Sequence, residues 1–435
     1  MQSIKSICKR LIVWLLTLEA RLLLHRHKPK IAAVTGSVGK TSTKDAVFSV
    51  LSGTYRVRKS DKSYNSDIGV PLTILGLRNP WNNPLLWAKA LYEGFVTALF
   101  QKEYPEWLVL EVGADHPGDI RRIAKWLKPD IAVLTAVPNI PVHVEFFPSP
   151  DAVLAEKRHL IDAVVPGGVV IIDGDCEKTA AIAKHLKGNV YTFGYDDGLL
   201  VRVSEAAIVY DDESNVPEGM EYEFVTKGNT YCVEITDMLG AHLALPIAVA
   251  IAIGEHLGIP KDKIEERLSI HETPQGRMRI IKGEKETILI DDTYNASPYA
   301  TEAALAAIRD LEISGKRIAI LGDMSELGKH TGDAHNEVGA SAKSIVDRLI
   351  TIGARARGIA EGARTAGMDP QHIHEFSQGD WDSVVATVRK YMEKGDVILV
   401  KGSQSVRLER AVVKLLHDAS DANKLVRQDA EWKNR

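Results

Sequence analysis

Residues 35–42 read Thr-Gly-Ser-Val-Gly-Lys-Thr-Ser, and this stretch decides the fold. A short apolar run, 31–34, precedes it, and a segment of helical character, 43–51, follows it. A strand, a glycine turn, Lys-Thr and a helix form a cradle in which backbone N–H groups and the helix N-terminus hold phosphate oxygens. Val34 stands where the full Walker pattern has its first glycine, so the match is to the shorter form G-x-x-G-K-T. The stretch predicts a nucleotide-binding α/β protein; the alternative is a glycine turn with an exposed lysine.

Two side chains of this loop have expected roles in binding a nucleotide. Lys40 would neutralise the β- and γ-phosphates, and the hydroxyl of Thr41 would hold Mg²⁺. The full set predicted to contact the nucleotide phosphates is Gly36, Ser37, Val38, Gly39, Lys40, Thr41 and Ser42.

Length and composition bound the class of protein. The chain has 435 residues, so we expect two or three domains. It is 45% hydrophobic and 26% charged with a net charge of −4, which fits a globular protein and gives no sign of nucleic-acid binding. Cys8, Cys176 and Cys232 lie far apart, without the spacing of a disulfide framework or a zinc site, so we expect a reducing, cytosolic compartment.

The N-terminal segment, 1–28, predicts an amphipathic helix surrounded by positive charge. Apolar side chains recur at helical spacing at Ile4, Ile7, Leu11, Trp14, Leu15, Leu18 and Leu22. The apolar run 11–18 is much shorter than the roughly 20 residues of a membrane span, and no cleavage site of a signal peptide follows. Two interpretations stay open: contact of residues 4–24 with an anionic membrane surface, or packing of the helix on its own domain or a partner subunit. We therefore expect a cytoplasmic protein, peripheral at the inner membrane face under the first interpretation.

Beyond this helix, apolar runs alternate with helical stretches. The predicted strands are 31–34, 107–112, 131–135 and 169–172, and helices are predicted at 119–127 and 151–164. This alternation is typical of a parallel sheet with helices on both faces. Residues 195–236 instead predict a small antiparallel element, and 242–269 a helical segment.

A turn-rich stretch, 271–276, predicts a domain boundary, after which a second α/β pattern begins. Its predicted strands are 288–290, 317–321, 348–352 and 397–400, and its predicted helices are 299–312, 335–344, 381–391 and 405–416. We expect an N-terminal helix (1–28), a P-loop domain with a parallel sheet (29–275), a Rossmann-like α/β domain (276–420) and a polar tail (421–435).

Polar clusters follow several predicted strands, where α/β domains bind ligands. Glu111 ends one such strand and could hold Mg²⁺, or serve as a helix cap or surface carboxylate. His143 and Lys157 receive no role from spacing alone. Further clusters lie at 291–298, where an Asx-Pro turn is the alternative explanation, at 321–328 and at 401–403.

Taken together, these clusters resemble the Mur ligases, in particular the branch that adds D-alanyl-D-alanine. The motifs are TGSVGKTST (35–43), NSDIGVPLTIL (65–75), EVGADHPGDI (111–120), HVEFF (143–147) with Lys157, GR (276–277), DDTYNASP (291–298), LGDMSELG (321–328) with His335, and VKGSQSVRLE (400–409). They extend over most of residues 30–415.

The resemblance implies an ATP-dependent amide ligase of peptidoglycan precursor synthesis. It would activate the carboxylate of a UDP-N-acetylmuramoyl-tripeptide-like acceptor as an acyl phosphate and join it to D-alanyl-D-alanine. The resemblance assigns catalytic roles to Lys40, His143 and Lys157, metal binding to Thr41, Glu111, His143 and Lys157, the last of them carbamylated, and nucleotide contacts to Arg277, Asp292 and Asn295. The loops 323–328 and 401–403 would face the incoming dipeptide or the nucleotide.

The sequence also departs from the family pattern. The phosphate loop begins at Gly36, without the N-terminal domain that usually grips the UDP-sugar, and Leu243 and Pro246 replace asparagines beside the expected adenine site. Two alternatives therefore stay open. One is a ligase for another carboxylate or peptide acceptor, as in folylpolyglutamate synthase or cyanophycin-type enzymes; the other is a membrane-associated nucleotide-binding regulatory subunit. We expect a chain that acts as a monomer or with the help of a partner.

Overall fold

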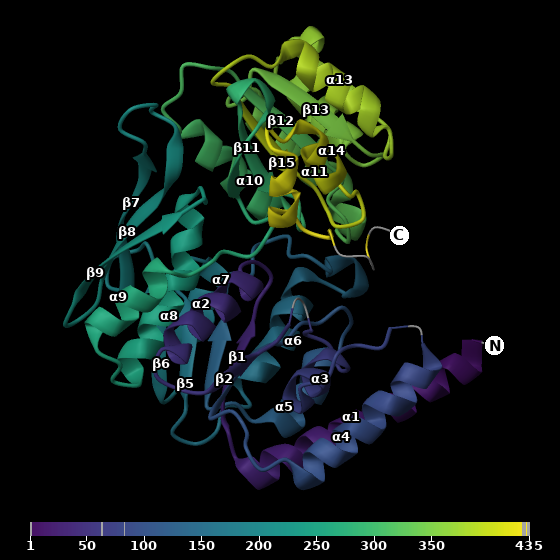
Figure 1. Cartoon of the computed structure of the whole chain (residues 1–435), viewed down its shortest axis with the longest axis vertical. Helices are drawn as coiled ribbons and strands as arrows, with labels where there is room; N and C mark the ends of the chain where they lie inside the picture. Colours follow the sequence, from purple (N-terminus) through teal and green to yellow (C-terminus); the bar gives the residue numbers. More distant parts are fainter. Residues whose placement is uncertain (1, 62–63, 82, 429–431, 433–435) are drawn as a thin grey trace.

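Two α/β domains lie one above the other, and a pair of long helices runs along the outer edge of the first (Figure 1). The computed structural model describes residues 2–61, 64–81, 83–428 and 432. The predicted α/β fold class with two successive domains is confirmed.

The first domain is built on a sheet of nine strands among the described residues. The order across this sheet is β2 (Val57–Lys59), β3 (Trp107–Glu111), β1 (Lys30–Thr35), β4 (Ile131–Leu134), β5 (Val169–Asp173), β6 (Asn189–Gly194), β7 (Val201–Tyr210), β8 (Pro217–Val225) and β9 (Thr230–Thr236). Strands β2 to β7 pair in parallel, and β7, β8 and β9 pair antiparallel. The predicted antiparallel element therefore exists, but it continues the parallel sheet.

Helices cover both faces of this sheet, because its central strands are apolar on both sides. In β1, Ile31 and Ala33 point into one core, and Ala32 and Val34 point into the other. The helices are α1 (Gln2–His27), α2 (Lys40–Ser52), α3 (Gly69–Leu75), α4 (Pro84–Phe100), α5 (Asp119–Leu127), α6 (Pro150–Ile161), α7 (Glu177–Ala183), α8 (Ala244–His256) and α9 (Lys261–Ser269). The predicted helical segment 242–269 is thus two helices, separated by a turn in which Gly258 has φ 69°.

The second domain holds a sheet of six strands among the described residues, with β10 antiparallel and the others parallel. Its order is β10 (Arg279–Lys282), β11 (Ile288–Asp292), β15 (Val397–Lys401), β12 (Arg317–Gly322), β13 (Arg348–Ile352) and β14 (Ile373–Phe376). Its helices are α10 (Pro298–Arg309), α11 (Thr331–Lys343), α12 (Arg357–Thr365), α13 (Trp381–Tyr391) and α14 (Glu409–Leu415). The predicted helix 405–416 begins only at Glu409, after a turn in which Arg407 has φ 65°.

Helices α1 and α4 lie side by side (Figure 1). Arg26 near the end of α1 donates to the backbone carbonyls of Ala98 and Leu99 near the end of α4, so the two helices run in the same direction. In the part of the chain that the structure describes, no helix is both long enough and apolar enough to cross a membrane.

The chain end packs against the second domain as far as residue 428. Leu425 and Val426 are buried, and Arg427 donates to a carboxylate oxygen of Glu409 at 3.0 Å. The rest of the predicted polar tail, except Trp432, lies outside the described residues.

Candidate functional site

The loop between β1 and α2 has the geometry of a phosphate cradle. Gly36 has φ 144° and Gly39 has φ 84°, and a Cβ atom at Gly36 would clash with the side chain of Thr135. Both positions therefore require glycine. The N–H groups of Ser37 and Val38 donate to the carbonyl of Ala136, which holds the loop against the end of β4. The first turn of α2 begins at Lys40 and presents its unpaired N–H groups at the loop.

A hydroxyl and a carboxylate meet directly behind this loop. Thr41 donates from Oγ1 to Oε2 of Glu111 at 2.9 Å, and Asn65 donates from Nδ2 to Oε1 of the same carboxylate at 3.0 Å. Glu111 ends β3 and is 2% exposed. The hydroxyl and carboxylate oxygens are of the kind that Mg²⁺ takes together with phosphate oxygens and water. Among the described residues, no three His, Cys, Asp or Glu side chains gather as a metal cluster.

Two buried lysines belong to the same electrostatic cluster. Burial lowers the pKa of Lys40, and the charge of Glu111 opposes this shift. Burial, and then the charge of Lys40, hold the pKa of Lys157 well below its usual range. Asp115 attracts both ammonium groups. Lys157 is therefore the side chain of this cluster that is most readily neutral at physiological pH.

His143 stands between the two domains. Its Nδ1 atom lies 2.6 Å from Oε2 of Glu326, which belongs to the loop after β12, and its Nε2 atom lies 3.9 Å from Oδ1 of Asp115. The hydrogen bond to His143 lowers the pKa of Glu326. Through Asp115, the imidazole adjoins the cluster of Lys40 and Lys157.

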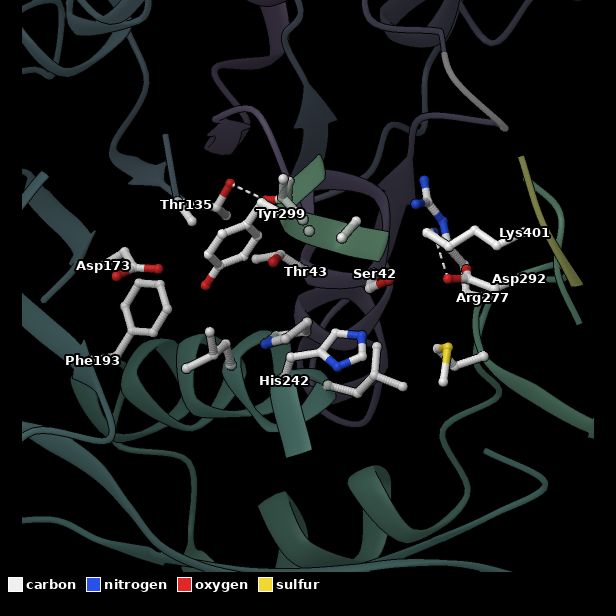
Figure 2. Close-up of a pocket in the computed structure, with 18 residues that line it drawn as sticks. Ser42, Thr43, Thr135, Asp173, Phe193, His242, Arg277, Asp292, Tyr299 and Lys401 are labelled. Atoms are coloured by element: carbon white, nitrogen blue, oxygen red, sulfur yellow. Dashed lines mark hydrogen bonds and ion pairs between the residues drawn. The ribbon is translucent and has the colours of Figure 1, made fainter. Parts of the chain in front are cut away.

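Next to the phosphate loop, a pocket lies between the two domains (Figure 2). The first domain contributes residues of α2, the ends of β4, β5 and β6, and the turn before α8; the second contributes the ends of β11 and β15 and the start of α10. Its lining residues are Val38, Gly39, Ser42, Thr43, Thr135, Ala136, Asp173, Phe193, His242, Leu243, Leu245, Pro246, Arg277, Met278, Asp292, Tyr299, Ala300 and Lys401.

The two ends of this pocket differ in chemistry. Phe193 and Asp173 lie at one end, and Arg277, Asp292 and Lys401 lie at the other (Figure 2). Burial lowers the pKa of His242, between them, to about 4, so its ring is neutral at pH 7. The aromatic end and the neutral imidazole suit a flat heteroaromatic base.

The cationic end is held by buried contacts. Lys401 donates from Nζ to Oδ2 of Asp292 at 2.5 Å, and the guanidinium of Arg277 lies 4.2 Å above the ring of Tyr294. Arg277 Nε and Ser37 Oγ are buried and have no hydrogen-bond partner within the described part of the chain. Buried polar groups are usually paired, so these two atoms fit an anionic ligand such as a phosphate.

A second cavity lies where His143 of the first domain meets the second domain. It is lined by His143, Asn295, Ser325, Glu326, Gln378, Gly379, Trp381, Ser403, Gln404, Ser405, Arg407, Arg410 and Trp432. Asn295, expected to contact nucleotide, lies here, whereas Asp292 and Arg277 line the first pocket. The 323–328 loop and the 401–403 turn likewise meet around this cavity, because Ser325 donates its N–H to Oγ of Ser403 at 2.8 Å.

Several residues of the site have no predicted role in the sequence. Asn65 and Asp115 stand in two of the quoted motifs, but only the fold shows that they face Glu111, Lys40 and Lys157. His242, Asp173 and Tyr299 come from three separate elements, and no spacing links them. Among these residues, Asp115 is the one that the sequence indicates most strongly as a site residue, because it follows the strand-end Glu111 by only four residues.

Fold and site thus define an ATP-dependent ligase built from a P-loop domain and a second α/β domain that closes the nucleotide pocket. The chain matches the Mur ligase middle domain over residues 34–254 and the Mur ligase glutamate ligase domain over residues 276–404. It belongs to the Mur ligase family.

Named relatives and solved structures agree with this assignment. The UDP-N-acetylmuramoyl-tripeptide–D-alanyl-D-alanine ligase of Bacillus subtilis is 30% identical over 91% of this chain and 78% of its own. The MurF ligase of Thermotoga maritima, solved in complex with ADP, superposes with a TM-score of 0.74 at 25% identity, covering 92% of this chain and 82% of its own. The folylpolyglutamate synthase of Mycobacterium tuberculosis shares the fold, with a TM-score of 0.62 at 16% identity over 92% and 94% of the two chains.

Proposed function

We propose that this ligase joins D-alanyl-D-alanine to a UDP-N-acetylmuramoyl-tripeptide-like acceptor in peptidoglycan precursor synthesis. The observation that carries this choice of substrate is the similarity, along about nine tenths of the chain, to ligases named for that reaction. In this reaction the terminal carboxylate of the acceptor attacks the γ-phosphate of ATP, ADP leaves, and the amine of the dipeptide then displaces phosphate from the acyl phosphate.

The nucleotide would lie in the pocket between the domains. Its base would occupy the aromatic end beside Phe193 and the neutral ring of His242, and its phosphates would meet the loop 36–42. Leu243 and Pro246 form an apolar wall where the family has asparagines, so the base would be held more by packing than by amide hydrogen bonds. Arg277 Nε and Ser37 Oγ would gain the partners that they lack.

Phosphoryl transfer depends mainly on alignment and on neutralising charge. Lys40, buried next to the loop, would neutralise the transferring phosphoryl group. Arg277 adds a second cation at the domain junction and is held in place by the ring of Tyr294. Closure of the second domain during the reaction would exclude water from this space and so protect an acyl phosphate from hydrolysis.

Mg²⁺ fits the oxygens of Thr41 and Glu111, and when bound it would supply charge neutralisation at the phosphates. We assign Lys157 and His143 to the same metal chemistry. A neutral lysine amine can add CO₂ and become a carbamate, which offers oxygen ligands where a cation stood. The low pKa of the buried Lys157 meets the first condition for this modification.

The second cavity suits the incoming dipeptide. It places two guanidinium groups, of Arg407 and Arg410, among hydroxyl and amide side chains. A dipeptide carries one carboxylate, which guanidinium groups bind well, and one amine that must reach the acyl phosphate. Asn295, whose backbone carbonyl accepts a hydrogen bond at 3.1 Å from Lys401 of the nucleotide pocket, marks the side from which that amine would enter.

Release of phosphate tests the proposed reaction. We expect release from ATP and Mg²⁺ only when D-alanyl-D-alanine and UDP-N-acetylmuramoyl-tripeptide are both present, and none with Lys40→Ala. Release that needs the acceptor but proceeds with another amine, or ATP binding without turnover on this pair, would overturn the choice of substrates. Activity that survives Lys40→Ala would overturn the assignment of the phosphate loop.

A further inference from the structure

Helix α1 is apolar on two opposite sides. It packs on its own domain through Leu16, Ala20 and Leu23, which are fully buried. The stripe that the sequence singles out instead faces outward: its exposed members are Ile7, Leu11, Trp14, Leu18 and Leu22, at 41–61% exposure. Packing on the domain therefore accounts for one side of α1 and leaves the predicted stripe without a partner among the described residues.

Helix α4 repeats this arrangement beside it. It packs through a row of small residues, Ala90, Gly94 and Ala98, which lets the backbones of the two helices approach closely. Its exposed large apolar side chains are Leu85, Leu86, Tyr92, Phe95, Leu99 and Phe100. Leu85, Tyr92 and Leu99 recur every seven residues, so they lie along one side of the helix.

These two helices concentrate the exposed apolar surface of the molecule. Of the 18 large apolar side chains exposed in the described chain, five lie on α1 and six on α4. Single exposed apolar residues are ordinary, but many of them on two neighbouring helices are typical of an interaction surface. Figure 1 shows the two helices along the edge of the first domain, and no residue that lines the nucleotide pocket belongs to them.

The positive charge of residues 1–28 indicates which kind of partner this surface binds. Residues 1–28 contain six lysines and arginines and one acid, Glu19, so they carry +5, whereas the whole chain carries −4. The remaining residues thus carry −9, and the positive charge gathers at the exposed helix. Two copies of the chain would bring two such cationic helices together, which disfavours a self-interface.

A groove beside α1 adds a place for an anionic headgroup. Residues of α1 and α5 line it: Lys9, Arg10, Val13, Trp14, Thr17, Arg122, Ile123 and Trp126, with Asp67 at its border. Cations next to indole rings are the combination found where proteins meet the headgroup region of a bilayer.

We propose that α1 and α4 together dock this ligase on a membrane surface rich in anionic phospholipid. The exposed apolar side chains enter the boundary between headgroups and acyl chains. The cations of α1 and of the groove face the lipid phosphates. The nucleotide pocket, on other elements, stays open to water.

Co-sedimentation of the full chain with vesicles tests this surface directly. We expect binding to phosphatidylcholine vesicles that contain phosphatidylglycerol, weaker binding at high salt, and little binding to phosphatidylcholine alone. The triple variant Leu11→Ser, Trp14→Ser, Leu18→Ser should lower the partition coefficient at least about tenfold, because its three apolar side chains enter the boundary. Lys9→Glu with Arg10→Glu should weaken binding to the anionic vesicles only.

The matched control replaces two exposed apolar residues elsewhere, Val216→Ser and Ile270→Ser, and should bind like the original chain. Thermal unfolding of each variant shows that the fold is intact. Equal binding by the triple variant and the original chain, or no binding to any vesicle, would overturn the proposal. So would a dimer in light scattering that the triple variant abolishes, which would make the surface a self-interface. None of these measurements needs ligase turnover, so their outcome is independent of the proposed reaction.

Discussion

Nδ1 of His143 lies 2.6 Å from Oε2 of Glu326, and this contact joins the first domain to the second. In metal-binding histidines, a carboxylate next to one ring nitrogen orients the ring and sets which nitrogen carries the proton. Nε2 of His143 lies on the side of Asp115, toward the cluster of Lys40 and Lys157. The orientation of His143 therefore depends on Glu326, which belongs to the second domain.

This dependence predicts the behaviour of Glu326→Gln. If His143 holds a metal ion, loss of the carboxylate should raise the Mg²⁺ concentration at half-maximal activity by about 10–100-fold, because the partner of a metal-binding histidine fixes its tautomer and orientation. Titrating Mg²⁺ at saturating ATP in the phosphate-release assay measures this. Glu337→Gln, at an exposed position on α11, is the control. An unchanged Mg²⁺ dependence in Glu326→Gln would refute the role given to the pair.

Lys157 should carry a carbamate. Burial, and then the charge of Lys40, lower the pKa of its buried amine and so favour the neutral form, and a neutral amine reacts with CO₂. We expect ¹³C NMR with labelled bicarbonate to show a carbamate signal that Lys157→Met lacks. The same variant should lose activity by about 100-fold, the upper range for a lost metal partner. Lys125→Met, on the exposed side of α5, should keep both signal and activity. A carbamate signal in Lys157→Met would place the modification elsewhere.

The buried pair of Lys401 and Asp292 should contribute strongly to stability as a unit. Lys401→Met leaves Asp292 buried without its partner and should lower the free energy of unfolding by about 3–5 kcal/mol. Adding Asp292→Asn should recover part of this loss, because the uncompensated charge is then gone. Urea unfolding measures both changes. Lys316→Met, which breaks an exposed pair with Glu393, should change the free energy of unfolding far less than Lys401→Met does. No recovery in the double variant would show that the loss comes from packing.

How much the sequence could predict depends on how local each signal is. The phosphate loop is a contiguous pattern and the predicted strands are short apolar runs, so both could be predicted from local sequence. Strand 348–352 and helices 119–127 and 381–391 have the expected bounds. Helix α4 was not predicted, because apolar residues stand on most of its sides and hide the helical period. Its partner α1 was predicted, but the sequence left open whether the stripe would pack on the domain or face outward, and it did not indicate that Leu16, Ala20 and Leu23 would pack on the domain.

The missed parts of the site share one physical reason. Glu326 and His143 come from different domains, and Asn65 and Glu111 come from different strand ends. Their proximity depends on sheet order and on how the domains meet, and neither is written in the spacing of a single motif. The sequence identifies such residues as members of polar clusters, and only the fold pairs them.

The last prediction concerns a carboxyl group held between the two outer helices. Glu19 of α1 is 8% exposed and lies against Gly94 of α4, and its Oε2 atom has no hydrogen-bond partner within the described chain. Burial raises the pKa of Glu19 from 4.5 to about 7. Between these values the folded chain keeps a proton that the unfolded chain has released. The free energy of unfolding should therefore fall as the pH rises from about 4.5 through about 7, and this contribution is lost above that range.

Glu19→Gln should remove this slope and stabilise the chain at pH above 7 by about 1–2 kcal/mol, with little change below pH 4.5. Urea unfolding across this range, with the exposed Glu93→Gln of α4 as the control, measures the difference. A Glu19→Gln chain that keeps the pH slope of the original would show that Glu19 titrates as an ordinary surface carboxylate.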